Sequence, residues 1–96
     1  MPRKKPPQLS VPEAARLFHL LGDPSRLRLL RLLAERQEAS VGDLCLTLRL
    51  PQSAASHHLM LLRRGRLVDY RRDGKQNFYR ISSADVPELL EQVGGE

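Results

Sequence analysis

The chain has 96 residues, of which 41% are hydrophobic, and a formal net charge of +5 at pH 7. This length suits a single domain and excludes a second, and no apolar run approaches the roughly 20 residues of a membrane span. Because the basic N-terminus precedes no apolar signal-peptide core, and the single Cys45 cannot form an internal disulfide, we expect a cytoplasmic protein.

The N-terminal part of the sequence predicts a basic arm followed by two helices. Residues 1–9 are rich in Pro, Arg and Lys and lack periodicity, so we expect a flexible arm before a folded domain at residues 10–94. Ser10 as N-cap and Glu13 form a capping box for the first helix. Asp23 caps a second helix, in which leucines recur at helical spacing.

The middle of the chain predicts a helix-turn-helix. Ser40 and Asp43 form a cap that opens a short third helix, and Cys45 lies on the apolar stripe of that helix. Pro51 keeps the residue before it out of the helical conformation, and a fourth helix is expected at about residues 52–64. Two helices joined by so short a turn form a helix-turn-helix.

A β-hairpin and a last helix complete the predicted elements. Strand-like runs flank Asp73-Gly74, a pair typical of a type I′ turn, in which both central residues have positive φ. A helix with a serine cap follows. The predicted fold is therefore α+β and mostly helical, with four helices, a hairpin and a C-terminal helix.

The positive charge is concentrated near the hairpin. Residues 63–80 hold seven basic and two acidic side chains, which gives this segment a net charge of +5. Clustered lysines and arginines favour a polyanionic partner, because they neutralise phosphates and release counterions. An ordinary solvated surface is the alternative interpretation.

Ser56, His57 and His58 stand side by side on the fourth predicted helix. Neighbouring helical residues point about 100° apart, so Ser56 and His57 are badly placed as nucleophile and base, and no nearby carboxylate could orient the histidine. Zinc sites commonly use histidines four residues apart or paired cysteines, and the sequence has neither. We therefore expect neither an enzyme nor a metal site.

The outward side of this helix suits the readout of DNA. His58 falls on the core stripe and is expected to be a hydrogen-bonded histidine at the core edge, whereas His57 points outward. Short polar side chains on a helix fit the major groove, and a basic hairpin can contact the neighbouring backbone. The predicted DNA-binding residues are Gln52, Ser53, Ala54, Ser56, His57, Arg63, Arg71, Arg72 and Lys75.

Three stretches, "LGDPSRLRLLRLL", "VGDLCLTLRLPQSAASHHLMLLRRGRLV" and "NFYRI", resemble the ArsR/SmtB family of bacterial winged helix-turn-helix repressors. The resemblance implies a homodimer in which the first and last helices pair, with recognition helices in successive major grooves and wings against flanking DNA. It also implies that many relatives release DNA on binding a metal or another signal. Apolar stripes on the terminal helices predict a dimer interface of Ala14, Leu17, Phe18, Leu21, Val86, Leu89, Leu90 and Val93.

The sequence departs from the metal-sensing and thiol-sensing members of this family. Where some members carry two cysteines, this chain has Ser40 and Gly42, and of the ligands that others place on the last helix only Asp85 is present. Thiol switches need two cysteines, so Cys45 is expected to pack in the core rather than to sense redox state. No metal and no cofactor is expected.

Two turns also depart from the family pattern. Relatives commonly have glycine where this chain has Arg49 and Arg66. A left-handed arginine costs about 1 kcal/mol or more, so Gly65 is expected to take the second turn one residue early. Pro51 replaces the usual serine N-cap of the recognition helix.

These features predict a homodimeric winged helix-turn-helix repressor that binds palindromic operator DNA. The other interpretation is a winged-helix module whose basic wing contacts a protein or RNA. Duplex binding should weaken steeply with salt and should prefer particular sequences, which distinguishes the two.

Overall fold

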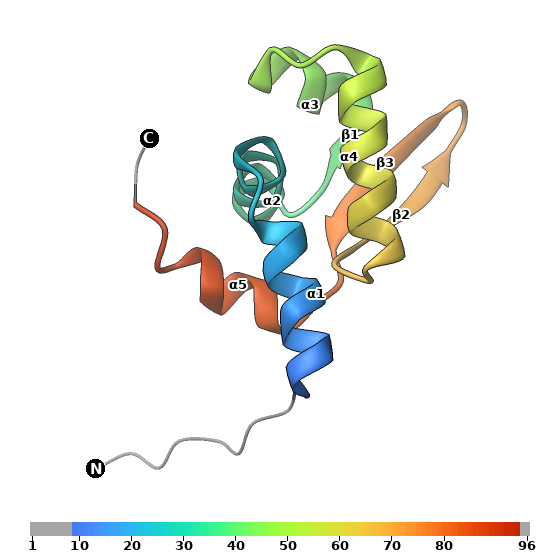
Figure 1. The fold of residues 1–96 in the computed structure, drawn as a ribbon. Helices are drawn as coiled ribbons and strands as arrows, with labels where there is room; N and C mark the ends of the chain where they lie inside the picture. The colour runs from blue at the N-terminus through green and yellow to red at the C-terminus, as the bar shows by residue number, and fades with distance from the viewer. Residues whose placement is uncertain (1–8, 95–96) are drawn as a thin grey trace.

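Five helices and a three-stranded antiparallel sheet make up residues 9–94, the part of the chain that the computed structural model describes (Figure 1). The predicted arm at residues 1–9 lies outside this part except for Leu9. The elements in chain order are α1 (Val11–Leu21), α2 (Pro24–Arg36), β1 (Ala39–Ser40), α3 (Val41–Leu48), α4 (Gln52–Arg64), β2 (Val68–Asp73), β3 (Gln76–Ile81) and α5 (Asp85–Leu90).

The first three helices begin at the capping residues that the sequence predicts. Side-chain oxygens of Ser10, Asp23 and Ser40 each accept a hydrogen bond from the backbone N–H three residues further on, at 3.2, 3.0 and 3.1 Å. Each bond satisfies one of the N–H groups that a helix start leaves without a partner. Because the caps are local, the starts of these helices could be read from the sequence.

The wing contains one strand more than the predicted hairpin. β1 pairs antiparallel with β3, with Ala39 opposite Tyr79 and Ser40 opposite Phe78, so the strand order is β1-β3-β2. A strand of two residues is too short to show alternation of apolar and polar side chains, which explains why it was not predicted. Because Ser40 is also the N-cap of α3, the sheet joins directly to the helix-turn-helix.

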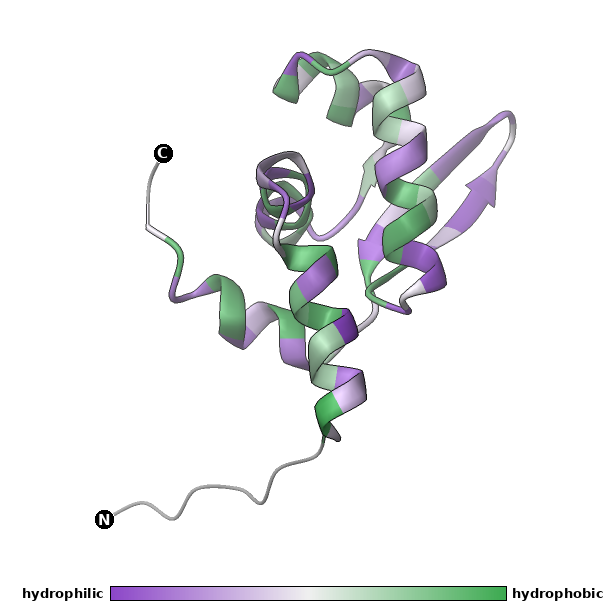
Figure 2. Ribbon diagram, in the orientation of Figure 1, coloured by the Kyte–Doolittle hydropathy of each residue, from purple (hydrophilic) through white to green (hydrophobic). Residues whose placement is uncertain are grey.

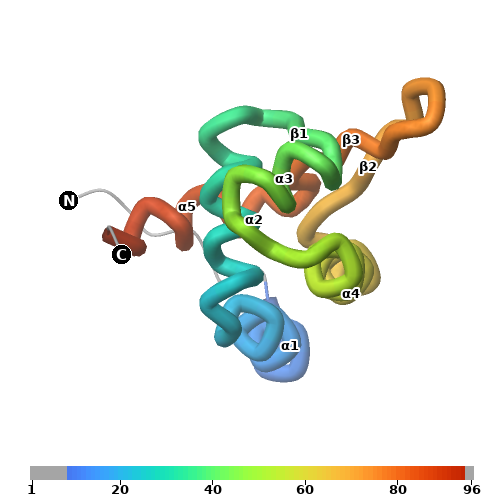
Figure 3. Tube along the Cα trace, turned by 90° about the horizontal axis from the view of Figure 1, so that it is seen from above, coloured from blue at the N-terminus to red at the C-terminus, as the bar shows by residue number. Residues whose placement is uncertain are grey.

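The prediction of a type I′ turn at Asp73-Gly74 is wrong by one residue. Asp73 pairs with Gln76, so the two central residues of the turn are Gly74 and Lys75. Only Gly74 has a positive φ, of 64°, which is the pattern of a type II′ turn with glycine first. Figure 3 shows that this tip projects beyond the helices.

Leucines of α2 form the centre of the core. Leu29, Leu30 and Leu33 are almost fully buried, and α2 contacts all four other helices and β3. Full burial of a leucine side chain stabilises the fold by about 1.5–3 kcal/mol, so this row is a main source of stability. The other fully buried large side chains are Leu44, Leu59, Leu62, Val68 and Val86. None of the helices between residues 9 and 94 has the length and apolar character to cross a membrane.

Two expectations about the remaining helices need correction. Cys45 is expected from the sequence to pack in the core, but it is only half-buried. Leu44 is the fully buried residue of α3. The last helix is shorter than expected and its N-cap is Ala84, while Ser83 accepts a hydrogen bond from the backbone N–H of Asp85. After Leu90 the chain continues in turns. The backbone N–H groups of Gln92 and Val93 donate to carbonyls three residues earlier, and no further α-helical turn forms.

Gly65 does not take the left-handed turn before the wing. Its φ is −78°, and Arg66 adopts a φ of 63° instead. Gly65 lies close to α1: a Cβ atom at this position would overlap Cδ1 of Leu20, so the end of that leucine side chain would have to move. The left-handed residue of this turn therefore falls one position later than expected, at Arg66.

Candidate nucleic-acid interface

The two sides of α4 differ sharply in burial. Ala55, Leu59 and Leu62 are fully buried against the core, as predicted. Of the residues on this helix that were predicted to contact DNA, Ala54 is half-buried. The others are exposed on the side away from the core: Gln52, Ser53, Ser56, His57 and Arg63. The structure therefore brings short polar side chains together along the N-terminal half of one exposed helix face.

His58 is held at the edge of the core by an arginine. Its Nδ1 lies 3.4 Å from Nη1 of Arg26, and the same guanidinium donates to the backbone carbonyl of Leu20 at 2.7 Å. This confirms the expectation of a hydrogen-bonded core-edge histidine. The contact joins the end of α1, the start of α2 and the middle of α4, and so it fixes the recognition helix against its neighbours.

The start of α2, the helix that carries Arg26, is also electrostatically stabilised. The backbone N–H of Arg26 donates to the carboxylate of Asp23, which lowers the pKa of Asp23, and the positive charge of Arg26 acts in the same direction. A negative N-cap also interacts favourably with the helix dipole.

The turn between α3 and α4 has an unusual conformation for its sequence. Arg49 adopts a left-handed conformation with φ 55° and ψ 44°, and its backbone N–H donates to the carbonyl of Cys45. Pro51, which has no side-chain acceptor, is the N-cap of α4. The turn thus closes through backbone hydrogen bonds alone, and both Arg49 and Gln52 face solvent.

The wing is held against α4 by stacked side chains. The guanidinium carbon of Arg63 lies 4.5 Å from the centre of the Tyr70 ring, and the Tyr70 and Tyr79 rings are 5.3 Å apart. Burial raises the pKa of Tyr79. Since Arg63 contacts Tyr70, this face of β2, which also carries Arg72, is the face turned toward α4.

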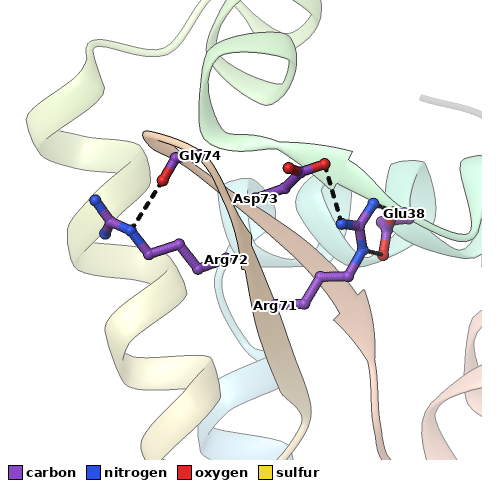
Figure 4. Close-up of polar contacts among 5 residues, drawn as sticks. All are labelled: Glu38, Arg71, Arg72, Asp73 and Gly74. Carbon is purple, nitrogen blue, oxygen red and sulfur yellow. Dashed lines mark hydrogen bonds and ion pairs between the residues drawn. The ribbon is translucent and has the colours of Figure 1, made fainter.

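The three predicted cations of the wing have different surroundings. Figure 4 shows Arg71 and Arg72 on opposite sides of β2. Arg72 donates to the carbonyl of Gly74 at 3.2 Å and, like Lys75, is exposed at the tip. Arg71 instead donates two hydrogen bonds to Glu38, at 2.9 and 2.7 Å. The wing strands are largely hydrophilic (Figure 2).

The predicted dimer residues divide into a buried and an exposed group. Leu17, Val86 and Leu90 belong to the core of the chain itself. Phe18 and Val93 are 61% and 36% exposed. Ala14, Leu21 and Leu89 are half-buried. Val11 was not among the predicted residues, although it is 83% exposed and lies seven residues before Phe18 on the same face of α1; this spacing could have revealed it.

The described residues do not gather the groups that metal binding needs. Within residues 9–94, no three His, Cys, Asp or Glu side chains are clustered so that they could hold an ion. The rings of His57 and His58 are 6.2 Å apart and tilted by 54°. Ser40, one of the positions where metal-sensing relatives were expected to have cysteine, is buried and caps α3.

A helix-turn-helix whose second helix exposes polar side chains, with a basic wing beside it, defines a winged helix-turn-helix DNA-binding protein. Residues 23–70 match the sequence model of the family described as "Bacterial regulatory protein, arsR family". This chain belongs to the ArsR family, and its class is that of transcriptional regulators rather than enzymes.

Individual relatives are similar over most of the chain. A transcriptional repressor SmtB homolog of Synechocystis sp. is 42% identical over 93% of this chain and 69% of its own. HlyU of Vibrio cholerae, named as a transcriptional activator, is 39% identical over 82% of this chain and 72% of its own. A solved HlyU structure superposes with a TM-score of 0.82 and covers 90% of this chain and 92% of its own.

A third relative is described as a homodimer. It is the winged helix-turn-helix DNA-binding domain of a possible ArsR-family regulator from Mycobacterium bovis, solved in solution. Its TM-score is 0.76 at 33% identity, over 85% of this chain and 75% of that domain. The winged helix-turn-helix fold predicted from the sequence is confirmed by these structures.

Proposed function

We propose that this protein is a repressor that binds palindromic operator DNA as a homodimer and reads it with the exposed face of α4. The observation that carries the proposal is the polar row of Gln52, Ser53, Ser56 and His57 on a helix whose opposite side is fully buried. A helix of this kind fits the major groove, where each base pair presents a distinct hydrogen-bonding pattern. This binding to DNA would take place in the cytoplasm.

The helix and the wing have different roles in binding. Gln52 stands at the start of α4, the part of a recognition helix that enters the groove, and a glutamine can pair bidentately with adenine. Arg72 and Lys75 lie at the exposed tip of the wing, where long cations reach phosphates but contact few base edges. We therefore assign specificity to α4 and sequence-independent affinity to the wing tip.

Exposed apolar side chains support assembly through α1. Val11 and Phe18 are 83% and 61% exposed on the same face, with Ala14 between them. Two copies related by a two-fold axis would cover this face and would match the symmetry of an inverted repeat. The homodimer described for the Mycobacterium bovis relative supports this assembly, and the name of the Synechocystis relative supports repression.

Metal responsiveness is not part of the proposal. The hydroxyl of Ser40 caps α3, and Gly42 has no side-chain ligand atom. We expect zinc, cadmium and arsenite at stoichiometric concentrations to leave the affinity for the operator unchanged. Tight stoichiometric metal binding accompanied by release of DNA, measured by isothermal titration and anisotropy, would contradict this.

The test compares two single variants on DNA selected by the wild-type protein from random duplexes. Gln52→Ala should cost about 1–3 kcal/mol on the selected site and much less on random duplex. Arg72→Ala should weaken both nearly alike and reduce the slope of log affinity against log salt by about one for each phosphate that the arginine no longer neutralises. Loss of sequence preference in Arg72→Ala but not in Gln52→Ala would overturn the assignment. RNA bound more tightly than any duplex would favour the interaction-module alternative.

A further inference from the structure

Arg71 and Glu38 form a bidentate ion pair across the wing. Nε and Nη2 of Arg71 donate to the two carboxylate oxygens of Glu38 at 2.9 and 2.7 Å (Figure 4). A third, longer contact joins Nη1 of Arg71 to Asp73 at 3.5 Å. The hydrogen bonds from Arg71 lower the pKa of Glu38, so the carboxylate is ionised at neutral pH.

The side chain of Arg71 joins the hairpin to the segment that precedes β1. Arg71 on the outer strand β2 lies opposite Phe78 on β3, and its guanidinium carbon is 4.8 Å from the centre of the Phe78 ring. Phe78 is in turn opposite Ser40 on β1. Glu38 precedes β1 directly, so the guanidinium crosses the middle strand to reach the segment that leads into the helix-turn-helix.

This ion pair complements the contact on the opposite face of the hairpin. There, Arg63 of α4 stacks on Tyr70 of β2. The hairpin is thus held by α4 on one face and by the α2–β1 junction on the other. With both contacts in place, the wing has a defined direction relative to the recognition helix.

We propose that Glu38 is a positioning residue for DNA binding: it holds Arg71 away from the phosphates and fixes the wing relative to α3 and α4. The proposal rests on the proposed function and replaces the expectation that Arg71 contacts DNA. An arginine that is not held can bind a phosphate of any sequence, which strengthens random binding as much as specific binding. An arginine held by Glu38 fixes the position of the wing instead of neutralising a phosphate.

The first test uses two amide variants that remove the same negative charge. Glu38→Gln should tighten binding to random duplex, raise the salt slope by about one for each protomer, and lower the ratio of specific to random affinity by about threefold to tenfold. Glu35→Gln on α2 is the matched control and should change neither slope nor ratio. A merely structural role of Glu38 would weaken binding to both duplexes without raising the slope, and this result would overturn the proposal.

The second test asks whether Arg71 touches phosphate. Arg71→Gln should reduce the ratio of specific to random affinity while leaving the salt slope unchanged. Arg72→Gln, in contrast, should reduce the salt slope by about one for each protomer. If Arg71→Gln and Arg72→Gln reduce the slope equally, Arg71 is a phosphate contact and the proposal fails.

A third measurement needs no DNA and so separates this proposal from the proposed function. Backbone ¹⁵N order parameters of residues 72–76 should fall in Glu38→Gln relative to wild type and Glu35→Gln. Unchanged order parameters would overturn the positioning role even if the protein binds its operator. A wild-type protein that fails to prefer any duplex would overturn the proposed function, and the ¹⁵N measurement would still test the ion pair.

Discussion

Arg49 and Arg66 both adopt left-handed backbone conformations, with φ of 55° and 63°. This region costs a residue with a Cβ atom about 1–2 kcal/mol, while glycine loses only the entropy of its freer unfolded chain. Both arginines stand at turns beside the recognition helix, one before α4 and one after it. These two positions therefore store local strain next to the candidate DNA surface.

Replacing Arg49 by glycine should stabilise the fold. We expect Arg49→Gly to raise the free energy of unfolding by about 0.5–1 kcal/mol, because relief of the left-handed cost exceeds the entropic cost of glycine. Arg64→Gly is the control: Arg64 ends α4 in a helical conformation, and the change should destabilise by up to about 1 kcal/mol. Urea unfolding measures both, and equal destabilisation by the two changes would contradict the strain argument.

Asp23 gives the fold a pH dependence whose sign can be stated. The folded-state pKa of Asp23 is lowered, first by the hydrogen bond from the backbone of Arg26, so its contribution is complete above the unfolded pKa of about 3.9. It is lost as the pH falls through the lower folded pKa. Asp23→Asn keeps a good N-cap but removes the charge.

The Asp23→Asn variant should therefore be less stable than wild type near pH 7 by about 0.3–1 kcal/mol, and this difference should shrink toward zero as the pH falls below the folded pKa. Denaturant unfolding between pH 7 and about pH 2.5 measures the difference. A difference that stays constant over this range would show that the charge of Asp23 does not stabilise the folded state.

At the scale of elements, α1 has two apolar faces with different roles. Leu17 is buried in the core of the chain, whereas Phe18 is 61% exposed beside it. A charge at position 17 would unfold the chain, so it could not report on assembly. A charge at position 18 leaves the core intact and tests the face that we assign to the dimer.

Phe18→Asp should convert the dimer to a folded monomer at micromolar concentration, because two charges would otherwise be buried across the two-fold axis. Leu46→Asp is the matched control, since Leu46 is 80% exposed on α3, away from α1. Sedimentation velocity should show a monomer for Phe18→Asp and a dimer for Leu46→Asp, with native circular dichroism for both. A dimeric Phe18→Asp variant would remove α1 from the interface.

The elements that sequence could predict are those with local signals. The starts of α1, α2 and α3 follow from caps within three residues, and α4 follows from its apolar spacing. β1 and the early end of α5 were missed, because they depend on pairing with β3 and on packing rather than on nearby residues. For the same reason, the sequence showed a basic segment but not which of its arginines are held internally: Glu38 is 33 residues from Arg71.

At the scale of the whole molecule, the candidate DNA surface and the candidate dimer surface lie on different parts of the fold. α1 and α5 lie at the end of the molecule away from α3, and the wing extends beside α4 (Figure 1). A second copy placed on α1 would therefore leave both recognition helices free. The two-fold relation of the recognition helices predicts DNA half-sites whose centres are about one turn of the DNA helix apart, or a multiple of that distance.

Footprinting of the wild-type protein on fragments of the genome that encodes it tests this account most directly. We expect the protein to protect an inverted repeat, with symmetric major-groove contacts in each half-site and backbone protection on both flanks from the wings. The selected fragments should bind with about a thousandfold or greater preference over random duplex at physiological salt. Protection that is uniform along all fragments, or confined to a single asymmetric site for one protomer, would contradict a homodimer that reads its operator through α4.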